Sequence, residues 1–321
     1  MFNFFKKNSR NSNPKKYPNL KIGLALGGGA TRGLTHIGVL KAFEEQGLKF
    51  DFVAGTSVGS LMGAFYCAGK SVKEMIEIAK NIKEKDIKPS KLVFVPSKTT
   101  GIENIITENL GDINIEDLEI PFSPVVVDIK STQEVALRKG NLAKAVAGSC
   151  AIPGVFVPVE FENYILADGG LQNAIPADVP KHFGCDYVIA VDVNHERTYG
   201  TDSTKLIDVL LASIRILMKS TPLKGYMYSD VILTPNTKKF KATKLDDIDE
   251  MIQEGYRVAK ASMNEILEVF ARKPIKKRKR LCKTPILNEN KVIDSETTMI
   301  QVQKMSHENV EKTKKIEDKV E

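Results

Sequence analysis

Two glycine-rich turns lie close together near the start of the chain, and each follows a short apolar run. The run at 21–26 (KIGLAL) leads into the first turn, and the run at 50–55 (FDFVAG) leads into the second. Between them, residues 34–47 carry apolar side chains at helical spacing and end at Gly47, which is typical of a helix C-cap. This pattern predicts a strand–helix–strand unit whose two glycine turns lie side by side at the carboxyl edge of a parallel sheet.

The rest of the chain continues to alternate short apolar runs with amphipathic segments. We predict further strands at 123–130, 163–168, 187–193 and 230–235. We predict further helices from Ser57 to Gly69 and at 71–85, 141–149, 176–183, 204–220 and 248–272. Apolar strands interleaved with helices indicate an α/β fold in which helices cover both faces of the sheet.

Charge divides the chain into three parts. Residues 1–19 form a basic leader that we expect to be flexible, residues 20–273 form one α/β domain, and residues 274–321 form a basic, then mixed-charge, mostly disordered tail. Although the whole chain has a net charge of +7, residues 21–271 carry 28 basic and 32 acidic side chains, so the positive charge belongs to the two ends. Such ends attract an anionic membrane or nucleic acid, although a simply solvated tail has the same composition.

The sequence also bears on the compartment. No apolar run reaches the roughly 18 residues of a membrane-spanning helix, and we find neither the apolar region nor the cleavage site of a signal peptide at the start. The four cysteines are far apart without a CxxC pair, which favours reduced thiols over disulfides or a zinc site. We therefore expect a cytoplasmic protein with no metal and no cofactor.

The second glycine turn, GTSVG at 55–59, has the form G-x-S-x-G and lies between a predicted strand and a predicted helix. This is the context of a nucleophile elbow, in which a serine on a tight turn projects its hydroxyl from the sheet edge. Gly55 and Gly59 would leave room for the turn and for close packing of helix on strand. A plain turn is the alternative, but the context favours Ser57 as a nucleophile.

The first glycine turn, GGGATRG at 27–33, can direct successive backbone N–H groups into one concavity that binds an oxyanion or a phosphate. A dinucleotide site would need a third glycine where Ala30 stands and an acidic residue at the end of the second strand. A phosphate loop of the Walker type would need a lysine and a hydroxyl residue after the turn. An oxyanion hole that serves Ser57 explains both glycine turns together.

A serine nucleophile needs a base, because its hydroxyl is weakly nucleophilic at neutral pH. Of the four histidines, His36, His182 and His307 fit other positions, and only His195, after a predicted strand, is suited to a catalytic triad. The other candidate is Asp168, which ends a predicted strand and is followed by two glycines. A partly buried carboxylate can act as a base, although a DGG sequence on its own is more typical of a tight turn.

Three motifs in this order, GGGATRG (27–33), GTSVG (55–59) and DGG (168–170), resemble those of the patatin-like phospholipase family, in particular its bacterial members. Segments 35–47, 148–159 and 174–193 resemble the same family, and the resemblance fades toward residue 270. It implies that residues 20–273 form a three-layer α/β/α patatin-like domain with the nucleophile elbow after the second strand.

The resemblance also implies a lipid acyl-ester hydrolase, of the phospholipase A or lysophospholipase kind, that uses a Ser57–Asp168 dyad and an acyl-enzyme intermediate. Ser57 is then the nucleophile and Asp168 the proton acceptor. The expected oxyanion hole consists of the N–H groups of Gly28, Gly29 and Ala30. Ala30 stands where many family members have glycine, but it keeps its N–H.

Other residues match the family motifs in supporting positions. Arg32 corresponds to a basic residue of the glycine loop, and together with Gly33 it is expected either to brace the loop or to contact a lipid phosphate. The remaining motif glycines are Gly55, Gly59, Gly169 and Gly170. The expected partner is a lipid or phospholipid substrate, with no specific nucleic acid.

Two other functions stay open at this point. One is a conventional esterase with a Ser57–Asp168–His195 triad, and the other is a non-catalytic regulator that binds membrane or nucleic acid through its basic tail. The basic ends of the chain, together with the apolar FNFF at 2–5, also suggest peripheral contact with the anionic inner membrane surface. The apolar LVFV at 92–95 fits a buried strand or a flap over the site.

Overall fold

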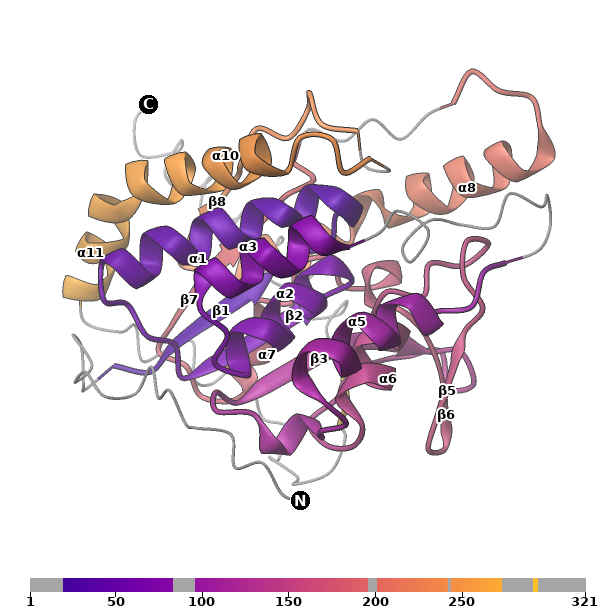
Figure 1. Cartoon of the computed structure of the whole chain (residues 1–321), viewed down its shortest axis with the longest axis horizontal. Coiled ribbons are helices and arrows are strands. Elements are labelled where there is room, and N and C mark those ends of the chain that lie inside the picture. The colour runs from indigo at the N-terminus through magenta and orange to yellow at the C-terminus, as the bar shows by residue number, and fades with distance from the viewer. Residues whose placement is uncertain (1–19, 83–95, 196–200, 242–243, 273–290, 294–321) are drawn as a thin grey trace, which may run out of the picture.

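The structure, a computed structural model, describes residues 20–82, 96–195, 201–241, 244–272 and 291–293 (Figure 1). The predicted leader, the 92–95 segment, the basic segment at 273–290 and His307 lie outside the described residues. Among the described residues, no helix combines the length and the apolar character needed to cross a membrane.

One sheet runs through the molecule. Its strands are β1 (Ile22–Leu26), β2 (Phe52–Thr56), β3 (Phe122–Asp128), β4 (Gln133–Ala136), β5 (Val159–Phe161), β6 (Tyr164–Asp168), β7 (Tyr187–Val191), β8 (Val231–Leu233) and β9 (Lys291–Ile293). Hydrogen bonds connect them in the order β5-β6-β3-β2-β1-β7-β8, with β4 also on β3 and β9 on β4. The strands β3, β2, β1, β7 and β8 are parallel, whereas β4, β5, β6 and β9 pair antiparallel.

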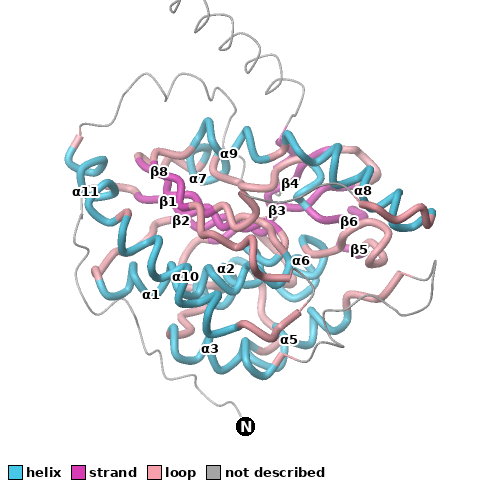
Figure 2. Tube along the Cα trace, turned by 90° about the horizontal axis from the view of Figure 1, so that it is seen from above, coloured by secondary structure: helices cyan, strands magenta, loops and turns pink. Residues whose placement is uncertain are grey.

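Helices cover both faces of this sheet. They are α1 (Thr35–Glu45), α2 (Val58–Cys67), α3 (Val72–Asn81), α5 (Thr100–Leu110), α6 (Leu142–Ser149), α7 (Asp178–His182), α8 (Leu206–Leu217), α9 (Pro222–Tyr228), α10 (Ile248–Ala261) and α11 (Met263–Ala271). Figure 2 shows α1, α2, α3, α5, α6 and α10 on one side of the sheet and α7 and α9 on the other. The predicted three-layer α/β/α class is therefore confirmed.

The central strands are apolar because they are buried on both faces. All residues of β1, β2, β3 and β7 are buried. On the first side, α1 crosses α10 so closely that a Cβ on Gly38 would lie 1.8 Å from the carbonyl oxygen of Ile252. The glycines at this crossing bring α10 onto α1, and this closes the core beneath the glycine turns.

Several predicted boundaries are wrong. The predicted helix 248–272 breaks at Ser262, which ends α10 and begins α11. The predicted 204–220 helix ends as α8 at Leu217 and continues as a 3-10 turn, after which α9 begins at a proline. The short strands β4, β5 and β9 were not predicted from the sequence, because segments of three or four residues carry too little periodicity. The helix α5, with 11 residues, was not predicted either. β9 adds a strand from within residues 274–321.

Candidate active site

Ser57 sits on the turn between β2 and α2. Its backbone has φ 55° and ψ −127°, a combination that costs a non-glycine residue about 1–3 kcal/mol and that occurs where function requires it. The carbonyl of Ser57 accepts the first hydrogen bonds of the helix, from the N–H groups of Ser60 and Leu61. The side chain of Ser57 is therefore held at the positive, N-terminal end of α2, where developing negative charge is stabilised.

The glycines of the G-x-S-x-G motif allow the turn to approach the sheet. A Cβ on Gly59 would lie 2.0 Å from the carbonyl oxygen of Leu26 in β1, and a Cβ on Gly55 would lie 2.5 Å from the carbonyl oxygen of Gly59. Real Cβ atoms are not found at such distances, so neither position accommodates a side chain without moving α2. The expectation that these glycines serve close helix–strand packing agrees with this geometry.

The register of β3 brings Ser57 and Asp168 together. Val125 pairs with Thr56 of β2 on one side and with Ala136 of β4 on the other. The next residue, Val126, pairs with Asp168 of β6 and again with β4. Because a strand has only two edges, β2 and β6 must occupy consecutive stretches of the same edge of β3. The carboxyl ends of β2 and β6 therefore meet, and Ser57 and Asp168 lie at this junction.

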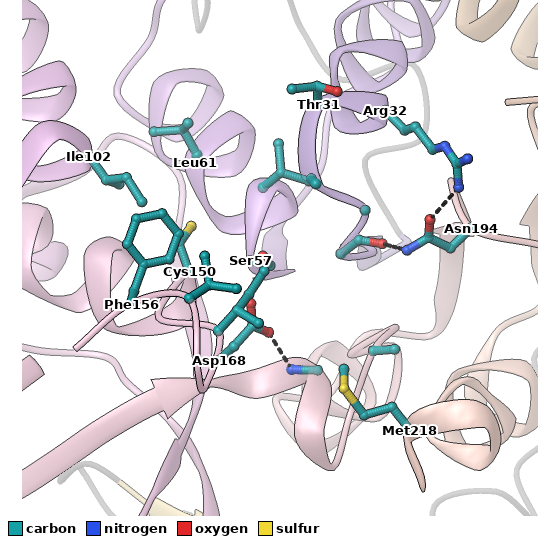
Figure 3. Close-up of a pocket in the computed structure, with 18 of the residues that line it drawn as sticks. Thr31, Arg32, Ser57, Leu61, Ile102, Cys150, Phe156, Asp168, Asn194 and Met218 are labelled. Carbon is teal, nitrogen blue, oxygen red and sulfur yellow. Dashed lines mark hydrogen bonds between the residues drawn. The ribbon is translucent and has the colours of Figure 1, made fainter. Parts of the chain in front are cut away.

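Asp168 is buried and is fixed by its neighbours. Its N–H donates to the carbonyl of Ala151, and its Oδ1 accepts from the N–H of Gly170 at 2.7 Å. A Cβ on Gly169 would lie 2.3 Å from the carbonyl oxygen of Val125, so the DGG turn needs its first glycine for close approach to β3. Ser57 and Asp168 face the same cavity (Figure 3).

The glycine loop lies against the nucleophile, since a Cβ on Gly28 would be 3.3 Å from the Cβ of Ser57. The structure does not support Gly28 as an oxyanion donor, because its N–H donates to the carbonyl of Ala174 at 3.0 Å. Among the described residues, no acceptor engages the N–H of Gly29 or Ala30. Ala30 has φ 50°, a strained value for a residue with a side chain.

The side chain of Arg32 is hydrogen bonded to two segments that are distant in the sequence, one of which also contacts the glycine loop. Its Nε donates to the carbonyl of Phe240 at 3.0 Å, and its Nη1 donates to Oδ1 of Asn194 at 3.4 Å. Asn194 in turn donates from Nδ2 to the carbonyl of Gly28 at 2.9 Å (Figure 3). Burial lowers the pKa of the Arg32 guanidinium from its usual value. Gly33 packs under the loop, where a Cβ would lie 2.3 Å from the side chain of Val58.

The described histidines form hydrogen bonds with groups other than Asp168. His195 is exposed, and its Nδ1 lies 2.9 Å from the hydroxyl of Tyr226, which donates to Asp192. His36 is fully buried and hydrogen bonded to the carbonyl of Gly27, and burial lowers the pKa of its imidazole to about 4. None of the described histidines lines the cavity that Ser57 and Asp168 share.

Two buried residues at the end of α6, Ser149 and Cys150, were not predicted from the sequence as site residues. The hydroxyl of Ser149 donates to the carbonyl of Val125 at 2.6 Å and accepts from the N–H of Ser57 at 2.9 Å. Ser149 therefore bridges the junction of β2 and β6. The Cys150 thiol contacts the Ser57 side chain, and burial raises the pKa of that thiol far above its usual range. These contacts join residues that are far apart in the sequence, so only the folded structure reveals them.

We predict that Ser149→Ala separates positioning from binding. The change leaves the N–H of Ser57 and the carbonyl of Val125 buried without a partner, which costs about 1–3 kcal/mol of unfolding free energy. Displacement of the Ser57 hydroxyl should lower kcat by about 10- to 100-fold, with little change in KM. Ester-hydrolysis kinetics and urea unfolding measure both effects.

Ser123→Ala is a matched control for this prediction. Ser123 is equally buried, but its hydroxyl has no hydrogen-bond partner among the described residues. The control variant should keep both its stability and its kcat. Equal losses in the two variants, or an effect of Ser149→Ala on KM alone, would contradict a positioning role for Ser149.

The cavity at this junction has a volume of about 350 Å³. Its walls are mostly apolar and come from segments far apart in the sequence, including Leu61 of α2, Ile102 of α5, Phe156 after α6 and Ile214 of α8. The polar groups converge at one end, where the Ser57 hydroxyl, Asp168 and the glycine loop meet. An apolar pocket with a few convergent polar groups is typical of a binding or active site for an apolar ligand.

The comparisons with known proteins agree with the predicted resemblance. The family model described as patatin-like phospholipase matches residues 24–181, a range that includes all three motifs. The chain is 34% identical over 195 residues to neuropathy target esterase sws of Drosophila melanogaster, covering 56% of this chain and 14% of that protein.

Two further relatives extend the similarity. Patatin-like phospholipase domain-containing protein 6 of Mus musculus is 31% identical over 275 residues, covering 75% of this chain and 20% of its own length. An uncharacterized NTE family protein of Mycobacterium bovis is 33% identical over 178 residues, covering 54% of this chain and 49% of its own length. The matched region is thus a minor part of the animal relatives and about half of the mycobacterial protein. Residues 24–181 of this chain form a domain of the patatin-like phospholipase family.

Proposed function

We propose that this chain hydrolyses acyl esters of lipids with Ser57 as the nucleophile and Asp168 as the base. The observation that carries the proposal is the junction on β3, which brings a strained serine and a buried carboxylate to one apolar cavity. The family supports the choice of a lipid substrate, and relatives whose names include esterase and phospholipase support ester hydrolysis.

The reaction has two halves. Ser57 Oγ attacks the ester carbonyl carbon while its proton passes to the Asp168 carboxylate. The N–H groups of Gly29 and Ala30 hold the oxyanion, and such a donor commonly contributes about 3 kcal/mol of transition-state stabilisation. The tetrahedral intermediate expels the alcohol, which takes the proton from Asp168. Water then attacks the acyl-enzyme, Asp168 accepts the proton of that water and returns it to Ser57 Oγ, and the fatty acid leaves.

Two features of the site fit this chemistry. The apolar walls suit an acyl chain, and they keep water away from the polar end, where electrostatic interactions are therefore stronger. Arg32 is already engaged with Phe240 and Asn194, so we assign it to bracing the glycine loop rather than to a lipid phosphate. The acyl-enzyme route requires no cofactor.

We predict that Asp168→Asn lowers kcat/KM on a soluble short-chain ester by about 10²- to 10⁴-fold, because general-base catalysis contributes on that scale. His195→Ala should leave the rate nearly unchanged, because His195 is paired with Tyr226 on the surface. Initial rates of the wild type and the two variants measure this difference. A large loss in His195→Ala would favour the conventional triad instead.

A further inference from the structure

The helix α8 has apolar side chains on two opposite faces. Its inner face contributes Leu211 and Ile214 to the wall of the cavity that contains Ser57. Its outer face is exposed to solvent, and we call this set the α8 outer face: Leu206 (61% exposed), Val209 (42%), Leu210 (49%), Ile216 (54%) and Leu217 (78%). Figure 1 shows α8 at the upper right edge of the molecule. One helix therefore separates the candidate active site from an exposed apolar surface.

A helix that is apolar on nearly all sides is normally buried. With 12 residues, α8 is too short to span a bilayer, which needs about 20. A short helix of this kind is suited to lie in the interface plane of a lipid surface with one face immersed. Exposed apolar patches on folded proteins mark interaction sites.

The exposed apolar surface continues from α8 onto the loop after α6. The loop after α6 contributes Val155 and Phe156 to the cavity wall, and Val157 on the same loop is 43% exposed. This loop contacts α8 directly, since a Cβ on Gly154 would lie 3.3 Å from Leu211. We call the part of the cavity between α8 and this loop the cavity mouth. A lipid that passed from a membrane into the cavity there would meet apolar side chains along its path.

Charge around α8 indicates the kind of surface. Between residues 205 and 219, Lys205 and Lys219 are exposed basic side chains, whereas Arg215 lines the cavity and Asp208 is the single acidic side chain. Asp208 accepts a hydrogen bond from the hydroxyl of Ser203, so its carboxylate lies beside the segment that precedes the helix. In a symmetric dimer the same patch would face itself, and these positive charges would repel each other. An anionic lipid surface attracts them instead.

We propose that the α8 outer face docks the protein on an anionic lipid surface, with the cavity mouth directed at the lipid. This inference rests on the proposed function, because it assumes that the substrate lies in that surface. The docking itself does not depend on catalysis, so the two can be tested separately.

The experiment uses the full chain with Ser57→Ala, so that vesicles stay intact, in two versions. One version carries Leu210→Ser and Leu217→Ser, two outer-face changes that leave the cavity wall untouched. The matched control carries Ile129→Ser, an exposed isoleucine (46%) that follows β3 and hydrogen bonds to Ile165 at the start of β6. Sedimentation with phosphatidylglycerol-containing vesicles and with pure phosphatidylcholine vesicles measures binding.

We expect the α8 variant to lose at least about tenfold in partitioning to anionic vesicles, while the control keeps it. Because both versions retain the basic ends of the chain, those ends cannot produce the difference. Equal binding by both versions would overturn the inference. So would a dimer of the wild type, detected by light scattering, that the α8 changes dissociate, because a second copy would then cover the face.

Activity separates this inference from the proposed function. With Ser57 restored, the α8 variant should hydrolyse a soluble monomeric ester at the wild-type rate and a vesicle-borne ester more slowly. If the wild type cleaves neither ester but binds vesicles through α8, the proposed function fails and the docking stands. If both esters are cleaved equally well by the α8 variant, the docking fails and the proposed function stands.

Discussion

Ser57→Ala is expected to lower kcat/KM for ester hydrolysis by at least about 10⁴-fold, because the hydroxyl forms the covalent bond of the acyl-enzyme. Alanine has the same backbone preferences as serine at φ 55°, so the change removes the nucleophile without relieving the strain of the turn. Thermal unfolding should therefore show little change, which separates loss of chemistry from loss of fold. A variant that retained more than a few per cent of the activity while folded would exclude Ser57 as the nucleophile.

Lys224→Met is expected to cause the largest loss of stability. Lys224 Nζ lies 2.8 Å from Oε2 of Glu134 and 2.8 Å from Oδ2 of Asp178, and both carboxylates are buried. Removing the cation leaves two carboxylates without their counter-charge in the interior, which costs about 3–5 kcal/mol of unfolding free energy. Urea unfolding of the variant and of Lys219→Met, which replaces an exposed lysine, measures the difference. Equal small losses in the two variants would contradict a stabilising role for this buried network of Lys224, Glu134 and Asp178.

The same network predicts an unusual pH dependence for the Lys224→Met variant. In the wild type, burial raises the pKa of Glu134. Burial also acts to raise the pKa of Asp178, but the charges of Lys224 and His182 and the hydrogen bonds from Lys224 and Asn173 together outweigh it, and that pKa is lowered. Without Lys224, burial and mutual repulsion raise the pKa of both carboxylates above their unfolded values. The folded state then binds more protons than the unfolded state, so the variant should regain stability as the pH falls from 7 toward 5. Unfolding measured at both pH values checks this sign.

This network also reaches the candidate active site. Asn173 donates from Nδ2 to both Glu134 and Asp178, while its carbonyl accepts from the hydroxyl of Thr56 at 2.8 Å. Thr56 precedes Ser57, and the N–H of Asn173 donates to Gly169 in the DGG turn. The buried carboxylates of Glu134 and Asp178 therefore hold Asn173 in place. Asn173 in turn hydrogen bonds to a residue next to each of the two proposed catalytic residues.

Local features of the sequence were sufficient to predict the centre of the fold. The runs at 21–26 and 50–55 correspond to β1 and β2, and the glycine turns that follow them come together as expected. Ser57 could be proposed as the nucleophile from the sequence because a G-x-S-x-G between strand and helix has few structural interpretations. The three-layer class followed from the alternation of apolar runs with amphipathic segments.

Long-range contacts account for what the sequence could not reveal. The hydrogen bond of the Gly28 N–H depends on Ala174, and the hydrogen bonds of the Arg32 side chain depend on Phe240 and Asn194. The pairing of Val125 and Val126 with β2 and β6 is a matter of register, which no single segment specifies. A helix such as α8, which is apolar on both faces, has a sequence typical of a buried helix. Only the fold shows that one of its faces is exposed.

Covalent labelling with a fluorophosphonate ester probe tests the central claim most directly, because the probe reacts preferentially with an activated serine. The wild type and Ser57→Ala are incubated with the probe in detergent, and intact mass and peptide mapping locate the adduct. We expect one adduct on the wild type, located at Ser57, and none on Ser57→Ala. A folded wild type that stays unlabelled, or an adduct that persists in Ser57→Ala, would contradict a Ser57 nucleophile.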